Sequence, residues 1–335
     1  MSKHWYSSFQ KSNDKINIYP PPPLVATLSS YTDTTNRARP GTGYDGVVLV
    51  SNGTSYGSGV LLYNGRAVLT AAHLLYGEVA RDVTVYFETE DGQRALGASL
   101  IKIYPDYDPL YNNGDIALVW LSEAAPDDAE RYGLYRDDDA VGQQFTMAGY
   151  GVPGTGETGI DWDYAGAPLR LKAENRFDAD AAALKDALGG VNSWNPDAGT
   201  QFVADFDNGQ RQYDALGFLF DLTDTGTVSE GMVTPGDSGG PAFINGKIAG
   251  NASYIGIYSG HDYDSIPFNG SFGELGFWQK TSYYQQWIDQ SLREEYPDAP
   301  ERCEEVEHTV IEGDNETTYA YFLLEFIGLR DNPDE

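Results

Sequence analysis

Short apolar runs separated by two-residue turns begin near residue 47 and set the architecture of this chain. Val47–Val50, Gly59–Tyr63 and Ala67–Thr70 are separated by Asn52-Gly53 and Asn64-Gly65. Asn-Gly is a strong signal for a β-hairpin, because both central positions of a type I′ turn need a positive φ. We therefore predict antiparallel strands joined by two successive hairpins.

The same pattern continues to residue 280. Further strands are predicted at 82–88, 98–104, 116–121, 144–150, 201–206, 242–244, 247–250, 254–258 and 276–280. Short strands at this spacing are typical of a closed or nearly closed β-barrel. Helices are predicted at 178–188 and at 283–295, where Trp287, Ile288 and Leu292 share one face. The pattern indicates an all-β fold with a C-terminal helix.

The chain carries a formal net charge of -30, from 51 acidic and 21 basic residues. Nucleic acids and anionic membranes repel such a surface, so neither is an expected partner. The sequence has no run of about 18 apolar residues, so we expect no transmembrane helix and no insertion into a membrane.

Cysteine usage and the N-terminus bear on location. Cys303 is the single cysteine, so no disulfide can form within the chain. Residues 1–10 lack the apolar segment of a standard signal peptide. We expect a secreted or extracellular protein that uses a route without a recognisable N-terminal signal, and a cytoplasmic location is the alternative.

Composition divides the chain into three parts. Residues 1–43 are polar and contain Pro20–Pro23, which predicts an extended N-terminal arm that lies on the surface or is partly disordered. Residues 44–295 hold the strand pattern, with one barrel at about 44–125, a second at about 140–282 and the helix at 283–295. Residues 296–335 form an acidic extension with apolar runs spaced for a β-hairpin around residues 313–315.

A glycine-rich serine turn lies at Thr234–Pro241. Glycine allows a turn to expose a hydroxyl and to aim successive N–H groups at one point. His73 follows an apolar strand after two alanines, and Asp115 opens another apolar strand. A partly buried Asp that accepts a hydrogen bond from His fixes its tautomer and stabilises the imidazolium. Each residue alone is more often structural, but together they predict Ser238 as a nucleophile with a base and an orienting acid.

These segments resemble the motifs of chymotrypsin-like serine proteases. Gly57–Leu62 and Val68–His73 together resemble the histidine motif of that family. Asp115–Val119 is similar to the aspartate motif, and Gly236–Pro241 to the serine motif. The similarity runs from about residue 44 to residue 292, and the cysteine-free framework is closer to bacterial members than to digestive ones. The resemblance implies two packed six-stranded Greek-key β-barrels with a cleft between them.

The resemblance also implies a mechanism. His73 would take the proton of Ser238 during attack on a peptide carbonyl, and Asp115 would orient His73. The backbone N–H groups of Gly236 and Ser238 would form the oxyanion hole. The implied function is that of a monomeric serine endopeptidase, which acts on proteins or peptides through an acyl-enzyme and requires no cofactor.

The specificity pocket departs from the trypsin pattern. By its spacing from the serine, Met232 is implied at the base of the primary pocket, with Gly260 and Gly276 at its walls. Methionine is apolar and flexible. A small or apolar P1 side chain is therefore expected, rather than Lys or Arg.

Three acids leave questions open. Glu230 or Glu274 would reverse the expected preference if either entered the pocket. In many relatives the Asp before the nucleophile, here Asp237, pairs with a new N-terminal ammonium. No activation sequence is evident in this chain, so we expect another group to satisfy Asp237.

Calcium is an option at Glu88, Glu90 and Asp91, which cluster in a turn of the first barrel. Calcium takes about six to eight oxygen ligands, so three acids are more typical of an exposed turn, and we predict no metal site. Two other functions stay open: a protease-like binding module with an acidic surface, and a latent precursor in which the N-terminal arm covers the cleft.

Overall fold

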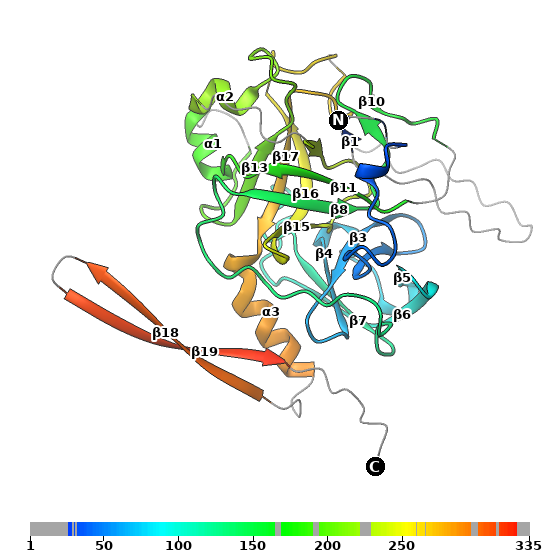
Figure 1. Ribbon diagram of the computed structural model, residues 1–335, viewed down its shortest axis with the longest axis vertical. Coiled ribbons are helices and arrows are strands. Elements are labelled where there is room, and N and C mark those ends of the chain that lie inside the picture. The colour runs from blue at the N-terminus through cyan, green and yellow to red at the C-terminus, as the bar shows by residue number, and fades with distance from the viewer. Residues whose placement is uncertain are drawn as a thin grey trace, which may run out of the picture.

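Two large β-sheets with related strand orders form the body of the protein (Figure 1). The computed structural model describes residues 26–28, 30, 32–164, 169–189, 194–221, 229–258, 260–264 and 266–295, and the strands at 301–312 and 315–326. The proline run of the predicted arm lies outside the described residues. No helix in the described part is long and apolar enough to cross a membrane.

The first sheet is a closed barrel with the order β2-β3-β4-β7-β6-β5. Its strands are β2 (Val47–Ser51), β3 (Tyr56–Leu61), β4 (Ala67–Thr70), β5 (Thr84–Thr89), β6 (Gly92–Ile103) and β7 (Ala117–Leu121). Both predicted hairpins are confirmed, because β3 pairs antiparallel with β2 and with β4. Along β2, Val48 and Val50 fill the barrel, whereas Val47 joins the core between the sheets.

The second sheet has the order β11-β8-β15-β16-β17-β13-β12. Its strands are β8 (Gln144–Gly149), β11 (Leu171–Arg176), β12 (Ala179–Asp180), β13 (Gln201–Asp205), β15 (Pro241–Ile244), β16 (Lys247–Ile257) and β17 (Glu274–Lys280). Only Phe177 and Asp178 separate β11 from β12, although these strands form opposite edges. The sheet is therefore strongly curled, so that the consecutive strands β11 and β12 form its two edges.

The curled sheet repeats the first barrel. If β11 and β12 are counted as one strand, the cyclic order of the second sheet matches that of the first. In Figure 1 the first barrel, blue to cyan, lies below the second sheet, green to orange. The predicted double-barrel architecture is confirmed, with the second barrel built as a curled sheet.

The helices are α1 (Ala181–Ala187), α2 (Ala215–Phe220) and α3 (Thr281–Glu295). The predicted helices correspond to α1 and α3, while α2 was not predicted. The apolar face of α3, with Tyr284, Ile288 and Leu292, packs in a core that also contains Val60 of the first barrel and Ile248 of the second sheet. The C-terminal helix therefore stabilises the junction between the two sheets.

A small third sheet includes the N-terminal segment. It has the order β10-β9-β1-β14, with β1 (Ala26–Thr27), β9 (Gly154–Thr155), β10 (Gly159–Ile160) and β14 (Gly231–Met232). Ala26 pairs with Met232 and is fully buried. Short 3₁₀ turns lie at η1 (Thr34–Asn36) and η3 (Ala80–Asp82). In the described part of the predicted arm, Ala26, Thr27, Asn36 and Ala38 are buried, and most of the other residues are exposed.

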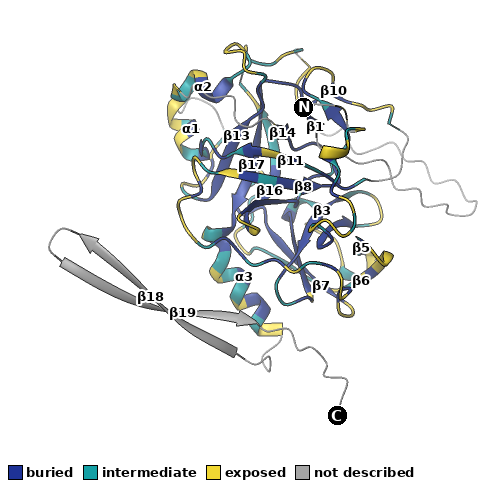
Figure 2. Cartoon of the chain, viewed as in Figure 1, coloured by how far each residue is buried: buried dark blue, intermediate teal, exposed yellow. Residues whose placement is uncertain are grey.

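Figure 2 shows that the strands of both large sheets are mostly buried, while exposed residues gather in turns and on α1 and α2. Beyond α3, the strands β18 (Glu301–Glu312) and β19 (Asn315–Phe326) pair antiparallel, with Glu312 opposite Asn315.

Candidate active site

His73 and Asp115 are joined by two hydrogen bonds. His73 lies in η2 (Ala72–Leu74), directly after β4, and Asp115 lies just before β7. These segments meet because the last residue of β4, Thr70, pairs with the first residue of β7, Ala117. Asp115 Oδ2 lies 2.7 Å from His73 Nδ1, and Asp115 Oδ1 accepts the His73 backbone N–H at 2.8 Å.

The surroundings of His73 act on its charge in opposite directions. Burial favours the neutral imidazole, whereas the charge of Asp115 and its hydrogen bond favour the imidazolium. The net effect raises the pKa of His73 above its usual value. The pair therefore has the electrostatics of a base that is stabilised once it has accepted a proton.

A third hydrogen bond to Asp115 comes from a residue that the sequence analysis missed. Ser253 Oγ, on β16 of the second sheet, donates to Asp115 Oδ2 at 2.5 Å. The carboxylate is fully buried, so donors from both sheets hold it in place. The sequence pattern predicts two strands, 247–250 and 254–258, where the structure has β16, and Ser253 lies between them. The signal in the sequence that could have identified Ser253 is its position as a polar residue directly after an apolar one, Ala252, in a region of predicted strands.

The serine turn is attached to the first barrel through Ser58 on β3. The Ser58 backbone N–H donates to the carbonyl oxygen of Ser238 at 2.8 Å. The Ser58 hydroxyl donates to the carbonyl oxygen of Gly236 at 2.8 Å and accepts the N–H of Tyr150 at 2.8 Å. Ser58 is fully buried, so it fixes the turn on both sides of Asp237.

The two expected oxyanion donors lie in this fixed turn. Within the described part of the chain, the N–H groups of Gly236 and Ser238 have no hydrogen-bond partner. Gly236 has a φ of 104°, and a Cβ atom there would lie 2.7 Å from the carbonyl oxygen of Tyr150. Only glycine fits this position. Both N–H groups are available to an anionic oxygen.

Ser238 lies beside the histidine turn without bonding to it. A Cβ atom on Gly239 would lie 2.6 Å from the nitrogen of Ala71, two residues before His73. No hydrogen bond joins the Ser238 hydroxyl to His73 among the described residues. The structure thus brings His73 and Asp115 together as a bonded pair, and packs the serine turn against the segment that carries His73.

Asp237 is satisfied by neutral groups. Its Oδ1 accepts the Gly151 N–H at 2.8 Å, and its Oδ2 accepts the Thr234 N–H at 2.9 Å. Burial raises the pKa of Asp237 to about 7, although these hydrogen bonds act to lower it. No Lys, Arg or His side chain of the described residues forms an ion pair with Asp237.

The structure brings two of the three expected pocket residues together. Met232 is fully buried, and its Sδ lies 3.2 Å from where a Cβ atom on Gly276 would be. Ile255 pairs with Gly276 across β16 and β17 and packs against the same core as Met232. Gly260 lies elsewhere, at a surface hollow of about 550 Å³ lined also by Gln210.

Glu230 and Glu274, the two acids that could reverse the expected P1 preference, both accept backbone N–H groups. Glu274 accepts the N–H groups of Asn269 and Gly270, each at 2.9 Å. Burial raises the pKa of Glu274 to about 7, against the lowering effect of these hydrogen bonds. Glu230 Oε1 accepts the Asp207 N–H at 3.1 Å.

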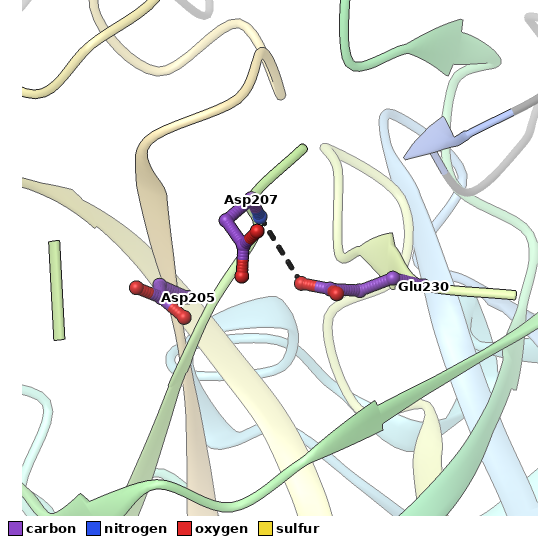
Figure 3. A group of neighbouring side chains, drawn as sticks. All are labelled: Asp205, Asp207 and Glu230. Carbon is purple, nitrogen blue, oxygen red and sulfur yellow. Dashed lines mark hydrogen bonds between the residues drawn. The ribbon is translucent and has the colours of Figure 1, made fainter. Parts of the chain in front are cut away.

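Candidate metal ligands gather at Glu230 and not at the first-barrel turn. Asp205, Asp207 and Glu230 each offer a carboxylate oxygen, and these oxygens lie within 4.8 Å of one another (Figure 3). Glu90 and Asp91 are exposed, and no such group includes them in the part of the chain that the structure describes.

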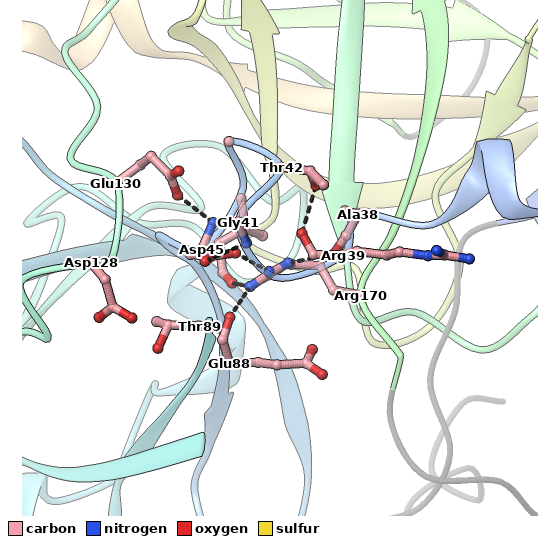
Figure 4. A network of polar contacts seen from close by, with 12 residues as sticks. Ala38, Arg39, Gly41, Thr42, Asp45, Glu88, Thr89, Asp128, Glu130 and Arg170 are labelled. Carbon is pink, nitrogen blue, oxygen red and sulfur yellow. Dashed lines mark hydrogen bonds and ion pairs between the residues drawn. The ribbon is translucent and has the colours of Figure 1, made fainter. Parts of the chain in front are cut away.

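A buried arginine links the two sheets near the site (Figure 4). Arg170, just before β11, is fully buried and pairs with Asp45 at 2.6 Å. It also donates to the carbonyl oxygens of Ala38 at 3.1 Å, Val47 at 3.1 Å and Glu88 at 3.0 Å. The N-terminal segment, the first barrel and the second sheet are therefore joined at one side chain.

Comparisons with known proteins agree with this architecture. A family model described as Trypsin matches residues 34–165, a span that includes His73 and Asp115. Among solved structures, the chain is similar to neuropsin, a serine protease expressed in the limbic system of mouse brain. That similarity has a TM-score of 0.55 and 19% sequence identity, and it covers 77% of this chain and 98% of the other. At this identity the likeness concerns the fold.

Proposed function

We propose that the chain is a serine endopeptidase of the trypsin-like family, with His73, Asp115 and Ser238 as its catalytic residues. The observation that best supports the proposal is the buried Asp115 carboxylate, which accepts hydrogen bonds from the backbone and ring of His73 and from Ser253. A structural histidine does not need an acid held from three directions, whereas a base that becomes positively charged does.

The proposed reaction follows from these positions. Ser238 Oγ attacks the carbonyl carbon of the peptide while His73 Nε2 accepts the hydroxyl proton. The carbonyl oxygen becomes anionic and accepts hydrogen bonds from the N–H groups of Gly236 and Ser238. The C–N bond breaks as His73 returns the proton to the leaving amine. Water then attacks the acyl-enzyme by the same route and releases the acid.

We further propose a preference for a small or apolar P1 side chain. Met232 and Gly276 lie together, and Ile255 narrows the same region from β16. Glu274, an acid that would attract Lys or Arg, accepts two backbone N–H groups, and Glu230 is buried beside Asp205 and Asp207. A peptide library tests this preference, and strong cleavage after Lys or Arg would contradict it.

A fluorophosphonate probe tests the catalytic assignment, because it labels only a serine activated by its base. We expect the chain to be labelled and the Ser238→Ala variant to remain unlabelled. Absence of labelling in a chain folded by circular dichroism would sink the assignment and favour a binding module. Labelling only after removal of residues 1–25 would favour a latent precursor.

A further inference from the structure

Three buried carboxylates lie together in a part of the second sheet that the proposed reaction does not use. Asp205 is the last residue of β13, Asp207 follows two residues later, and Glu230 lies just before β14. All three are buried, and their ligand oxygens lie within 4.8 Å of one another. From this geometry we propose that Asp205, Asp207 and Glu230 bind a calcium ion.

Strand alternation places the two aspartates on one side of the chain. Ala204 and Phe206 pack in the core of the second sheet. Because side chains alternate along an extended chain, Asp205 and Asp207 point away from that core. In Figure 3 the carboxylate of Asp207 lies between those of Asp205 and Glu230. The cluster is therefore a consequence of the β13 backbone, which brings its acids close to Glu230, the residue just before β14.

Backbone N–H groups hold each carboxylate in place. The Leu216 N–H donates to Asp205 Oδ2 at 2.8 Å, and the Gly209 N–H donates to Asp207 Oδ1 at 2.6 Å. Glu230 Oε1 accepts the N–H of Asp207 at 3.1 Å. These bonds fix the orientation of the acids before any ion binds, which lowers the entropy cost of binding.

One oxygen of the cluster has no partner. Glu230 is 1% exposed, and its Oε2 atom is buried without a hydrogen bond. A buried carboxylate oxygen without a partner is costly, and native structures rarely leave one unsatisfied. Because this oxygen belongs to one of the three clustered carboxylates, an ion bound among them would satisfy it.

Among the described residues, no Lys, Arg or His forms an ion pair with Asp205 or Glu230, and Arg176 is 3.9 Å from the neighbouring Asp178. A cation would offset the repulsion between these clustered carboxylates.

The chemistry of the donors favours calcium. All three side chains offer carboxylate oxygens, which suit hard cations and not zinc or copper. Calcium–oxygen distances are about 2.3–2.6 Å, so ligands on opposite sides of the ion lie about 4.6–5.2 Å apart. Oxygens within 4.8 Å of one another fit around such an ion. Backbone carbonyls or water would complete the coordination.

The test uses the full chain with Ser238→Ala, so that the result does not depend on proteolytic activity or self-cleavage. Isothermal titration with CaCl₂ should show one ion bound per chain, and thermal unfolding should shift upward when Ca²⁺ replaces EDTA. In Glu230→Gln, which keeps the size of the side chain, affinity should fall by about 10–100-fold. Asp207→Asn provides a second variant if Glu230→Gln does not fold.

The matched control is Glu90→Gln, which neutralises an exposed acid of the first-barrel turn and should leave calcium affinity unchanged. The proposal is overturned if Ser238→Ala binds no Ca²⁺ at millimolar concentration, or if Glu230→Gln and Asp207→Asn bind it as well as the parent. Tighter binding of Mg²⁺ than of Ca²⁺ would overturn the identity of the ion. Failure here leaves the fluorophosphonate result untouched, because the two readouts are independent.

Discussion

Asp115 sets the charge of His73, and this gives a prediction for the pH dependence of activity. The base works only when neutral, so kcat/KM should rise with pH as His73 loses its proton. Since Asp115 raises the pKa of His73, Asp115→Asn should move this rise to lower pH. It should also reduce kcat by roughly 10⁴-fold, because the tautomer is no longer fixed. Profiles of kcat/KM against pH for both proteins provide the measurement.

The control for this prediction is Asp91→Asn, which removes an exposed charge from the turn between β5 and β6. It should leave both kcat and the profile unchanged. If Asp115→Asn lowers kcat but keeps the acid limb at the same pH, then Asp115 does not set the charge of His73.

Ser58 is expected to act as a positioning residue for the serine turn. Ser58→Ala would leave the Gly236 carbonyl and the Tyr150 N–H buried without this partner, which costs about 1–3 kcal/mol each at most. Because the turn would be less firmly held, we expect kcat to fall by about tenfold or more, with little change in KM. Steady-state kinetics and urea unfolding measure the two effects separately.

Ser99→Ala is the comparison for Ser58→Ala. Its hydroxyl also donates to backbone carbonyls, of Trp120 and Leu121, but within the first barrel. We expect normal kcat in this variant. A loss of stability in Ser58→Ala with kcat unchanged would mean that Ser58 is purely structural.

The proposed catalytic residues could be predicted from the sequence because each lies in a short recognisable motif. His73, Asp115 and Ser238 each follow or precede a strand in a short motif, so their positions could be predicted. Ser253 could not, because its role depends on a bond to a residue 138 positions away, on a strand of the other sheet. Whether Ser238 and His73 are bonded depends on side-chain geometry that no pattern in the sequence contains.

The two-residue strand β1 is expected to have a large effect on stability and on the active site for its size. It pairs with β14, which carries Met232 and leads into the serine turn. Ala26→Asp would place a charge at a fully buried position. We expect a loss of about 3 kcal/mol or more of unfolding free energy, together with slower fluorophosphonate labelling. Urea unfolding and labelling kinetics measure these effects.

Leu28→Asp provides the comparison one residue beyond β1. Its side chain is 39% exposed, so stability and labelling should stay close to those of the parent. If both substitutions changed stability and labelling equally, the pairing of β1 with β14 would not be the cause of the effect of Ala26→Asp.

Long strands and helices with a clear hydrophobic period could be predicted from the sequence, whereas short ones could not. The strands of the first barrel and α3 carry enough alternating or helical residues to show their type. β1 and β14 have two residues each, too few for any period, and they are defined by pairing: β1 pairs with both β14 and β9. The helix α2 has six residues and is started by the Asp214 cap, a signal that competes with many other turns.

The arrangement of the whole molecule was predicted through the resemblance, not through pattern alone. Alternating residues indicated strands, but the matching cyclic order of the two sheets follows from pairings between distant segments. The curling of the second sheet depends on the short link from β11 to β12, within a region where the sequence showed no clear strand.

Arg170 is expected to determine the stability of the whole molecule. Arg170→Met would leave Asp45 as a buried, unpaired charge and remove three bonds to carbonyls. Breaking such a pair typically costs about 3–5 kcal/mol. Adding Asp45→Asn should recover part of this loss, because it removes the unpaired charge. Urea unfolding of the single and double variants gives the coupling energy.

Arg94→Met tests whether the effect is specific to the buried pair. Arg94 and Glu123 are exposed and 3.9 Å apart, so breaking them should change stability by less than about 1 kcal/mol. Losses of equal size at both pairs would refute the role of Arg170.

The link at Arg170 consists of an ion pair and hydrogen bonds, and a chain with one cysteine has no internal covalent bridge to support it. Thiol reductants therefore have nothing to cleave. We expect dithiothreitol, at concentrations that open the disulfides of secreted proteins, to leave the unfolding midpoint unchanged. The folded state would then be equally stable in oxidising and reducing surroundings.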